Sequence, residues 1–247
     1  MYLPQSTGRK TASAVFLLPS LIGLTVFCLL PIAMSLIYSF MDYDLLAGTK
    51  TFIGGKNFIR ILGGKEFLQV LSHTMTYLGL YLPLILLCSV LEALALNRSF
   101  RGRGAFRAVF YTPVITSWVA AAVVWTWVLS GKYGLLNQML SMIGVTGPAW
   151  LNSKEWAMPG VVIAAVWKDT GYYALMVLAA LKSIDPAYYE AASIDGAGGM
   201  RKFFSITLPL LSPTLFLLIV INIIYGLQVF DSVLIMTNGG PGGATAV

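Results

Sequence analysis

The sequence predicts an all-α protein that crosses a membrane several times. Hydrophobic residues make up 57% of its 247 residues and charged residues only 11%, whereas a soluble domain carries about a quarter charged residues. The mean hydropathy is +0.79, and the apolar residues gather in long runs between short polar segments. In lipid, a single segment that is not part of a closed barrel can form all its backbone hydrogen bonds only as a helix. These runs are therefore predicted to be transmembrane helices.

Five apolar runs are long enough to span the bilayer. They cover residues of about 12–40, 70–96, 108–129, 156–181 and 208–230, with polar, glycine-containing loops at 41–67 and 130–155. Proline residues inside several runs predict kinks, which membrane helices tolerate. The chain stops in a glycine-rich loop after the fifth run. We therefore expect residues 1–247 to be a single transmembrane domain whose sixth span is missing by C-terminal truncation.

The Lys and Arg residues predict a cytoplasmic N-terminus. Nine of them lie before the first span or in the loops on that side, and six lie in the opposite loops, which are longer in total. A net charge of +6 can also indicate nucleic-acid binding. Here, however, the cations form short clusters between spans, which is typical of membrane topology, so we expect no nucleic-acid partner.

The stretch Glu190–Pro209 is a long polar interruption between the fourth and fifth spans. We predict two short helices there, at about residues 185–200. Asp185 is a candidate N-cap with Pro186 at the first helical position, and Gly196 ends the first helix. Such an exposed helix–glycine–helix corner, joined to two spans, suits the docking of a partner.

The sequence lacks the common catalytic motifs. It has no GxxxxGK[ST] loop for nucleotide phosphates, no HExxH, no paired CxxC and no GxSxG. We disfavour an intramembrane protease with Asp169 and Asp231 as its catalytic pair, because neither residue lies in the sequence context of such enzymes. An intramembrane enzyme is therefore the weaker alternative. A channel is also disfavoured, because it would not need a long corner that docks a partner.

Ionisable residues inside a span are costly and indicate function. Lys168 and Asp169 lie about halfway along the fourth span, with Tyr172 one turn beyond Lys168. Because adjacent helical residues point about 100° apart, these two charges cannot simply neutralise each other. We predict that they face a polar cavity or other helices.

The fifth span carries a polar stripe. Asn222, Tyr225 and Gln228 recur every three residues, and Gly226 lies beside them. Hydrogen bonds between helices account for such a stripe. A path for a polar solute requires the same groups, so the periodicity leaves both interpretations open.

The corner resembles the EAA loop of the permease subunits of bacterial ATP-binding cassette (ABC) importers. That pattern contains Glu-Ala-Ala, a Gly six residues after the Glu, and then Ile-x-Leu-Pro. The matching residues here are Glu190-Ala191-Ala192, Gly196, Ile206 and Leu208-Pro209. Other stretches resemble the carbohydrate-uptake branch, of the maltose and glycerol-3-phosphate type. They are Phe52–Phe58, Asn97–Arg107, Gly134–Asn137, Trp167–Tyr172 and Thr237–Gly242.

The resemblance implies a permease subunit of the bacterial inner membrane that forms half of the translocation path for a sugar or sugar derivative. The implied partners are a second permease, two cytoplasmic ATPase subunits and an extracytoplasmic solute-binding protein. ATP and Mg²⁺ would bind to the ATPase, and this chain would hold no cofactor or metal. A permease for a polyamine or a phosphate-containing solute is the alternative.

The resemblance also assigns residues to two sites. The corner would dock the ATPase through Glu190, Ala191, Ala192, Asp195, Gly196 and Ala197. The substrate path would include Lys168, Asp169, Tyr172, Asn222, Tyr225, Gly226 and Val229, and the three-residue periodicity adds Gln228.

Overall fold

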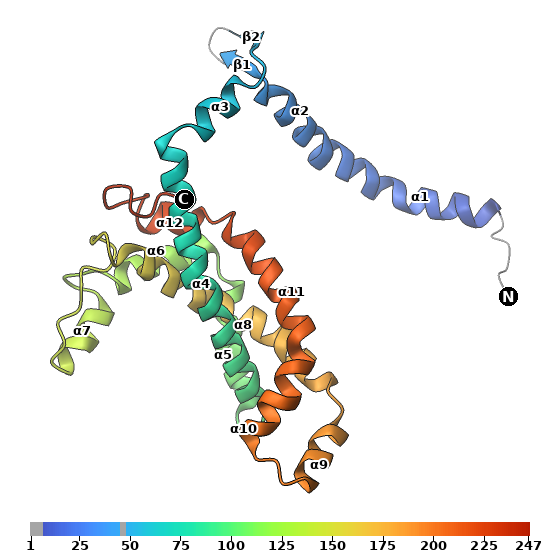
Figure 1. Cartoon of the computed structure of the whole chain (residues 1–247), viewed down its shortest axis with the longest axis vertical. Helices are drawn as coiled ribbons and strands as arrows, with labels where there is room; N and C mark the ends of the chain where they lie inside the picture. The colour runs from blue at the N-terminus through green and yellow to red at the C-terminus, as the bar shows by residue number, and fades with distance from the viewer. Residues whose placement is uncertain (1–6, 45–47) are drawn as a thin grey trace. The chain divides into compact units, whose positions relative to one another are not determined.

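The structure is a computed structural model that describes residues 7–44 and 48–247, in two compact units, Met1–Leu68 and Gln69–Val247 (Figure 1). Within the described residues, four helices are long and apolar enough to cross a membrane, and a bent helix pair makes a fifth if it counts as one span. The predicted all-α polytopic membrane fold is confirmed.

The first unit holds the first predicted span, at Val15–Ser39. No residue of this span is buried against the described chain. The helix widens into a π-helical segment just before Pro31, whose ring would otherwise clash with a carbonyl one turn earlier. The span consists of α1 (Thr7–Leu24), η1 (Thr25–Leu29) and α2 (Leu30–Ser39).

The predicted loop at 41–67 contains secondary structure, although residues 45–47 lie outside the described part. An antiparallel hairpin pairs Met41 with Phe52. The Asn57 Nδ2 donates to the carbonyl oxygens of Ser39 and Met41, both at 3.0 Å, and thereby caps the end of α2. The elements are β1 (Met41–Asp44), β2 (Thr49–Phe52) and α3 (Lys56–Leu62).

The second unit is organised around α8 (Ala157–Ser183), which contacts α5, α6, α11 and α12. Small residues let the helix backbones approach closely, as in many membrane bundles. At Gly171, an added Cβ would collide with the carbonyl oxygen of Phe110 on α5. The core also includes buried side chains of α4 (Lys65–Asn97), most of which lies in this unit, and its members include Tyr81, Ile85, Val161, Val177 and Leu218.

The third predicted span, 108–129, is not one straight helix. It is divided into α5 (Arg103–Ile115) and α6 (Trp118–Val128), which meet at 103°. Thr116 and Ser117 between them are extended. Pro113 lies in the last turn of α5, where its missing N–H and its ring weaken the continuing helix. Apolar length alone did not predict this bend.

The fifth span extends beyond its predicted start and ends earlier than predicted. It runs from Gly199 to Gly226 as α10 (Gly199–Lys202), η2 (Phe203–Thr207) and α11 (Leu208–Gly226). The π turn of η2 lies immediately before Pro209, in the same relation as η1 to Pro31. After Gly226 the chain turns and forms α12 (Asp231–Met236), so residues 227–230 lie outside the spanning helix.

Two further helices lie in the predicted polar segments of this unit. They are α7 (Leu135–Met142) and α9 (Pro186–Ile194). In Figure 1, α9 and α10 lie at one end of α11 and α12 lies at its other end. The C-terminal loop is tied back to α4, where His73 Nδ1 lies 3.0 Å from the carbonyl oxygen of Ala246.

Candidate functional site

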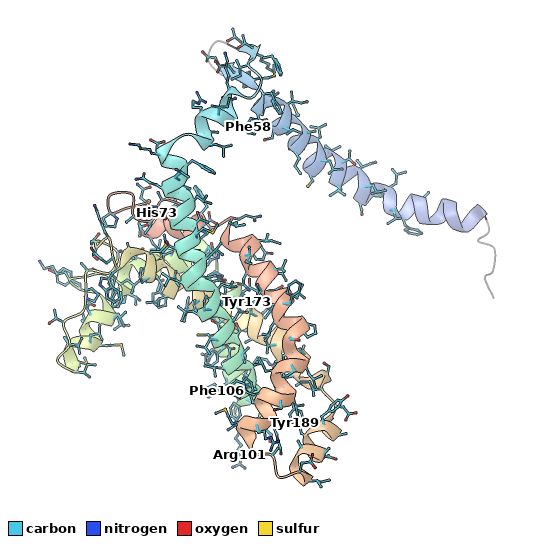
Figure 2. The ribbon with its side chains drawn as sticks, in the orientation of Figure 1. Phe58, His73, Arg101, Phe106, Tyr173 and Tyr189 are labelled. Atoms are coloured by element: carbon cyan, nitrogen blue, oxygen red, sulfur yellow. The ribbon has the colours of Figure 1, made fainter. Side chains whose placement is uncertain are left out.

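A cavity of about 470 Å³ lies in the second unit, where α4, the α5–α6 bend, α8, α11 and α12 come together. This volume is within the range of small-molecule sites. Aromatic residues dominate its wall, and Tyr173, labelled in Figure 2, is one of them. The aromatic lining residues are Tyr77, Tyr81, Trp118, Tyr172, Tyr173, Tyr225 and Phe230, and the polar ones are Asp169, Gln228, Asp231 and Ser232.

Asp169 is held in the cavity wall by a tyrosine from another span. The Tyr81 hydroxyl on α4 donates to Asp169 Oδ2 on α8 at 3.2 Å. Tyr77 stacks on Tyr81 one turn away, with ring centroids 5.3 Å apart. The wall therefore combines aromatic faces, which can stack on a solute, with a carboxyl group and hydroxyl groups that can hydrogen-bond to it.

Lys168 lies next to Asp169 in the sequence but does not line the cavity. Its side chain is buried, and its Nζ donates to the carbonyl oxygens of Pro113 and Val114 at 3.2 and 3.3 Å. The same ammonium group lies 5.3 Å from the ring centroid of Trp118. At the α5–α6 bend, Lys168 thus donates to the Val114 carbonyl and adds a donor to the Pro113 carbonyl, which also accepts from the N–H and the hydroxyl of Thr116. The roughly 100° between adjacent helical residues separates the two side chains, as predicted.

The predicted stripe of the fifth span divides between the cavity and the helix interior. Tyr225, Gly226, Gln228 and Val229 line the cavity, as Tyr172 of α8 does. Asn222 is fully buried and is absent from the lining. Its Nδ2 donates to the Leu218 carbonyl at 2.8 Å, and its Oδ1 has no partner among the described residues.

The structure thus brings together six of the eight residues predicted for the substrate path and places Lys168 and Asn222 apart from the cavity. Sequence reasoning missed other members of the wall. Tyr77 and Tyr81 carried a usable signal, because two tyrosines four residues apart share one face of a helix. Trp118 carried none, since it reaches the cavity only through the bend at 103°.

The corner between the fourth and fifth spans has the predicted helix–glycine–helix form. Asp185 is the N-cap of α9, and its Oδ1 accepts from the Ala187 N–H at 2.9 Å. Gly196 has φ +73°, the left-handed conformation that ends a helix. The amides of Gly196 and Ala197 then bond back to the carbonyls of Ser193 and Ala192, at 3.1 and 2.8 Å. This pair of bonds is a Schellman motif.

Side chains from both of its helices brace the corner, while Glu190 is exposed. The Tyr189 hydroxyl lies 2.9 Å from Thr207 Oγ1, and Lys202 Nζ donates to Ser193 Oγ at 2.6 Å. Both bonds join α9 to the α10–η2 segment. Figure 2 shows Tyr189 at this end of the unit. Large apolar side chains lie exposed around the corner at Tyr188, Ile194, Met200 and Phe204.

A protein-family model described as "Binding-protein-dependent transport system inner membrane component" matches residues 60–247. The chain is 36% identical over 231 residues to the trehalose/maltose transport system permease protein MalF of Thermococcus litoralis, an alignment that covers 94% of this chain and 78% of the relative. It is 32% identical to the sulfoquinovosyl glycerol transport system permease protein SmoG of Agrobacterium fabrum, over 96% of this chain and 78% of the relative.

A solved structure has the same fold. A chain of a bacterial ABC transporter involved in the import of the acidic polysaccharide alginate aligns with a TM-score of 0.82 and 29% identity. The alignment covers 97% of this chain and 81% of that one.

Proposed function

Since the chain belongs to the family of binding-protein-dependent transport system inner membrane components, we propose that it carries a sugar or sugar derivative as one permease subunit of an ATP-driven importer. Its role is transport and not catalysis, because the members of this family are permease subunits and ATP is hydrolysed on a partner chain. The described cavity would form this subunit's half of the translocation path.

The cavity wall is the observation that carries the choice of solute. Its described lining contains tyrosine faces, one amide and two carboxyl groups, but no Lys or Arg. Aromatic and hydroxyl groups suit a neutral, polyhydroxylated solute. A phosphate-bearing solute would meet Asp169 and Asp231 without a compensating cation, because Lys168 is engaged by backbone carbonyls. The name of the trehalose/maltose permease supports a neutral sugar, and that of the sulfoquinovosyl glycerol permease supports a sugar derivative, although a sulfonated one.

A phosphate-containing solute is the second candidate, because one relative is named for it. The chain is 34% identical over 232 residues to the sn-glycerol-3-phosphate transport system permease protein UgpA of Yersinia pestis. The acidic cavity argues for the neutral sugar between these two.

The corner at Glu190–Pro209 would dock the ATPase and transmit its ATP-driven movement to the spans. Its Schellman end presents Gly196 and the exposed residues Glu190 and Asp195 in a fixed geometry, and its exposed apolar side chains offer a docking surface. The tyrosine–threonine bond joins it firmly to the fifth span. A second permease, two ATPase subunits that bind ATP and Mg²⁺, and an extracytoplasmic binding protein complete the proposed importer, with the N-terminus of this chain in the cytoplasm.

The solute assignment is tested by uptake into vesicles that contain the complete importer. Tyr225→Ala should lower uptake about three- to tenfold, because a stacking face and a hydroxyl in the path are lost. The control is Tyr133→Ala, which removes an exposed tyrosine outside the cavity. Normal uptake with normal solute affinity in the Tyr225 variant would contradict solute contact by this residue and would indicate that it only packs against its neighbours.

The coupling assignment is tested by ATPase activity stimulated by the solute-loaded binding protein. Gly196→Ala forces a side chain into φ +73°, which costs about 1–2 kcal/mol and should reduce stimulation about tenfold while membrane insertion stays intact. Gly198→Ala is the matched control, because its φ is −71° and nothing lies within 4 Å of the new Cβ. Equal stimulation in both variants would refute docking through this corner.

A further inference from the structure

A second, basic pocket lies between the first turns of α5 and the last turn of α8. It is an open hollow of about 260 Å³ lined by the partly buried Arg103 and the exposed Gly104, Arg107 and Lys182. None of these residues lines the solute cavity. Arg103 and Arg107 are four residues apart, so they lie on the same face of α5. Three cationic side chains from two helices therefore surround one space.

The guanidinium group of Arg103 lacks a partner within the described chain. Its Nε and Nη2 atoms are buried and form no hydrogen bond. No Asp or Glu is among the described residues that line the pocket. A buried charged donor is costly unless it is paired. An anion from outside this part of the chain would supply the missing partner for these two nitrogen atoms.

Apolar rings lie beside the same cations. Phe106 stands between Arg103 and Arg107 in the sequence and is 54% exposed, and its ring contacts those of Phe100 and Phe110 at centroid distances of 5.5 and 6.1 Å. Figure 2 shows Phe106 and Arg101 at the same end of the unit as α10. This end of α5 thus presents cations and exposed aromatic rings within successive turns. Such a surface is complementary to a ligand that has a charged headgroup attached to acyl chains.

We propose that Arg103, Arg107 and Lys182 bind a phosphate group, supplied by the headgroup of an anionic phospholipid. Guanidinium groups match phosphate oxygens with two parallel hydrogen bonds, and Lys182 adds a point charge. The exposed rings of Phe106 and Phe110 then lie along the acyl chains. Basic pockets between transmembrane helices are a recurrent form of anionic lipid site. The proposal is independent of the transported solute.

The test uses the complete importer, purified in detergent and titrated with phosphatidylglycerol, phosphatidylcholine or inorganic phosphate, with bound lipid measured by native mass spectrometry. Phosphatidylglycerol should bind at least fivefold more tightly than phosphatidylcholine. Arg103→Gln and Arg107→Gln should each weaken phosphatidylglycerol binding about fivefold, the effect of one cation at a lipid surface. Arg103→Lys, which keeps the charge, should restore part of the loss.

The matched control is Arg101→Gln, which removes an exposed cation two residues from Arg103 and outside the pocket. It should leave lipid binding unchanged. Displacement of phosphatidylglycerol by millimolar inorganic phosphate, lost in Arg103→Gln, would support the phosphate site and assign it a soluble ligand. Equal lipid loss in the Arg101 variant, or no loss in the Arg103 and Arg107 variants, would overturn the proposal. Size-exclusion profiles identify any variant that fails to assemble.

Discussion

The corner and the cavity of the second unit are built in opposite ways. The corner depends on contacts between residues that are close in the sequence, such as the Asp185 cap on Ala187 and the Schellman bonds around Gly196. The cavity depends on contacts between distant elements, such as the bond from Tyr81 to Asp169, 88 residues apart. The element recognisable from a short motif is thus the local one, whereas the cavity forms only after the helices have packed.

We expect the largest loss of stability from a substitution that disturbs the helix packing around the cavity and leaves the corner unchanged. Gly171→Ala places a Cβ against the backbone carbonyl of Phe110, so α5 and α8 must separate. Such overpacking should lower the free energy of unfolding by about 3 kcal/mol, as measured by reversible unfolding in mixed micelles.

Gly79→Ala is the matched control for this prediction. Gly79 also lies inside a spanning helix, but nothing lies within 4 Å of an added Cβ. It should leave stability unchanged or raise it slightly. A similar loss in both variants would show that helix flexibility, and not close approach, decides the result.

A second pair of substitutions distinguishes the roles of the adjacent residues Lys168 and Asp169. Lys168→Met removes the donor from the Val114 carbonyl and one of three donors from the Pro113 carbonyl, and it should cost about 2 kcal/mol in the same unfolding measurement. Asp169→Asn keeps an acceptor for the Tyr81 hydroxyl and should change stability by less than about 0.5 kcal/mol, but it should alter uptake. The reverse order of stabilities would contradict the assignment of Lys168 to the bend.

The smallest effect is confined to the corner. Asp185→Ala removes the cap of α9 and should cost about 1 kcal/mol locally. Hydrogen exchange of the α9 amides should then quicken about fivefold, while the amides of α8 beyond its last turn exchange as before. Asp185→Asn keeps an oxygen acceptor and serves as the control. Slower uptake without faster exchange would indicate that Asp185 contacts a partner directly.

Much of this structure could be predicted where the determining forces are local. The apolar runs predicted the spans, and Asp185, Pro186 and Gly196 predicted the ends of α9. Adjacent positions on a helix also predicted that Lys168 and Asp169 diverge. Each of these inferences used only chain length, helix geometry or backbone conformation.

The remaining features depend on packing between elements. The bend at Thr116 and Ser117 is stabilised by a lysine more than fifty residues away, so the run 108–129 reads as one helix when taken alone. The break after Gly226 likewise brings Asp231 and Ser232 to the cavity from beyond the span. Such members of the wall have no signature in their own neighbourhood of the sequence.

The continuity of α10, η2 and α11 has a mechanical consequence. Gly199–Gly226 is one span of 28 residues, drawn in orange in Figure 1, and at 1.5 Å per residue it is about 42 Å long. A tilt of about 5° at its corner end would displace its far end by about 4 Å, more than the length of a hydrogen bond. Because Tyr225 lies near that far end, such a tilt would move it by more than the length of one hydrogen bond.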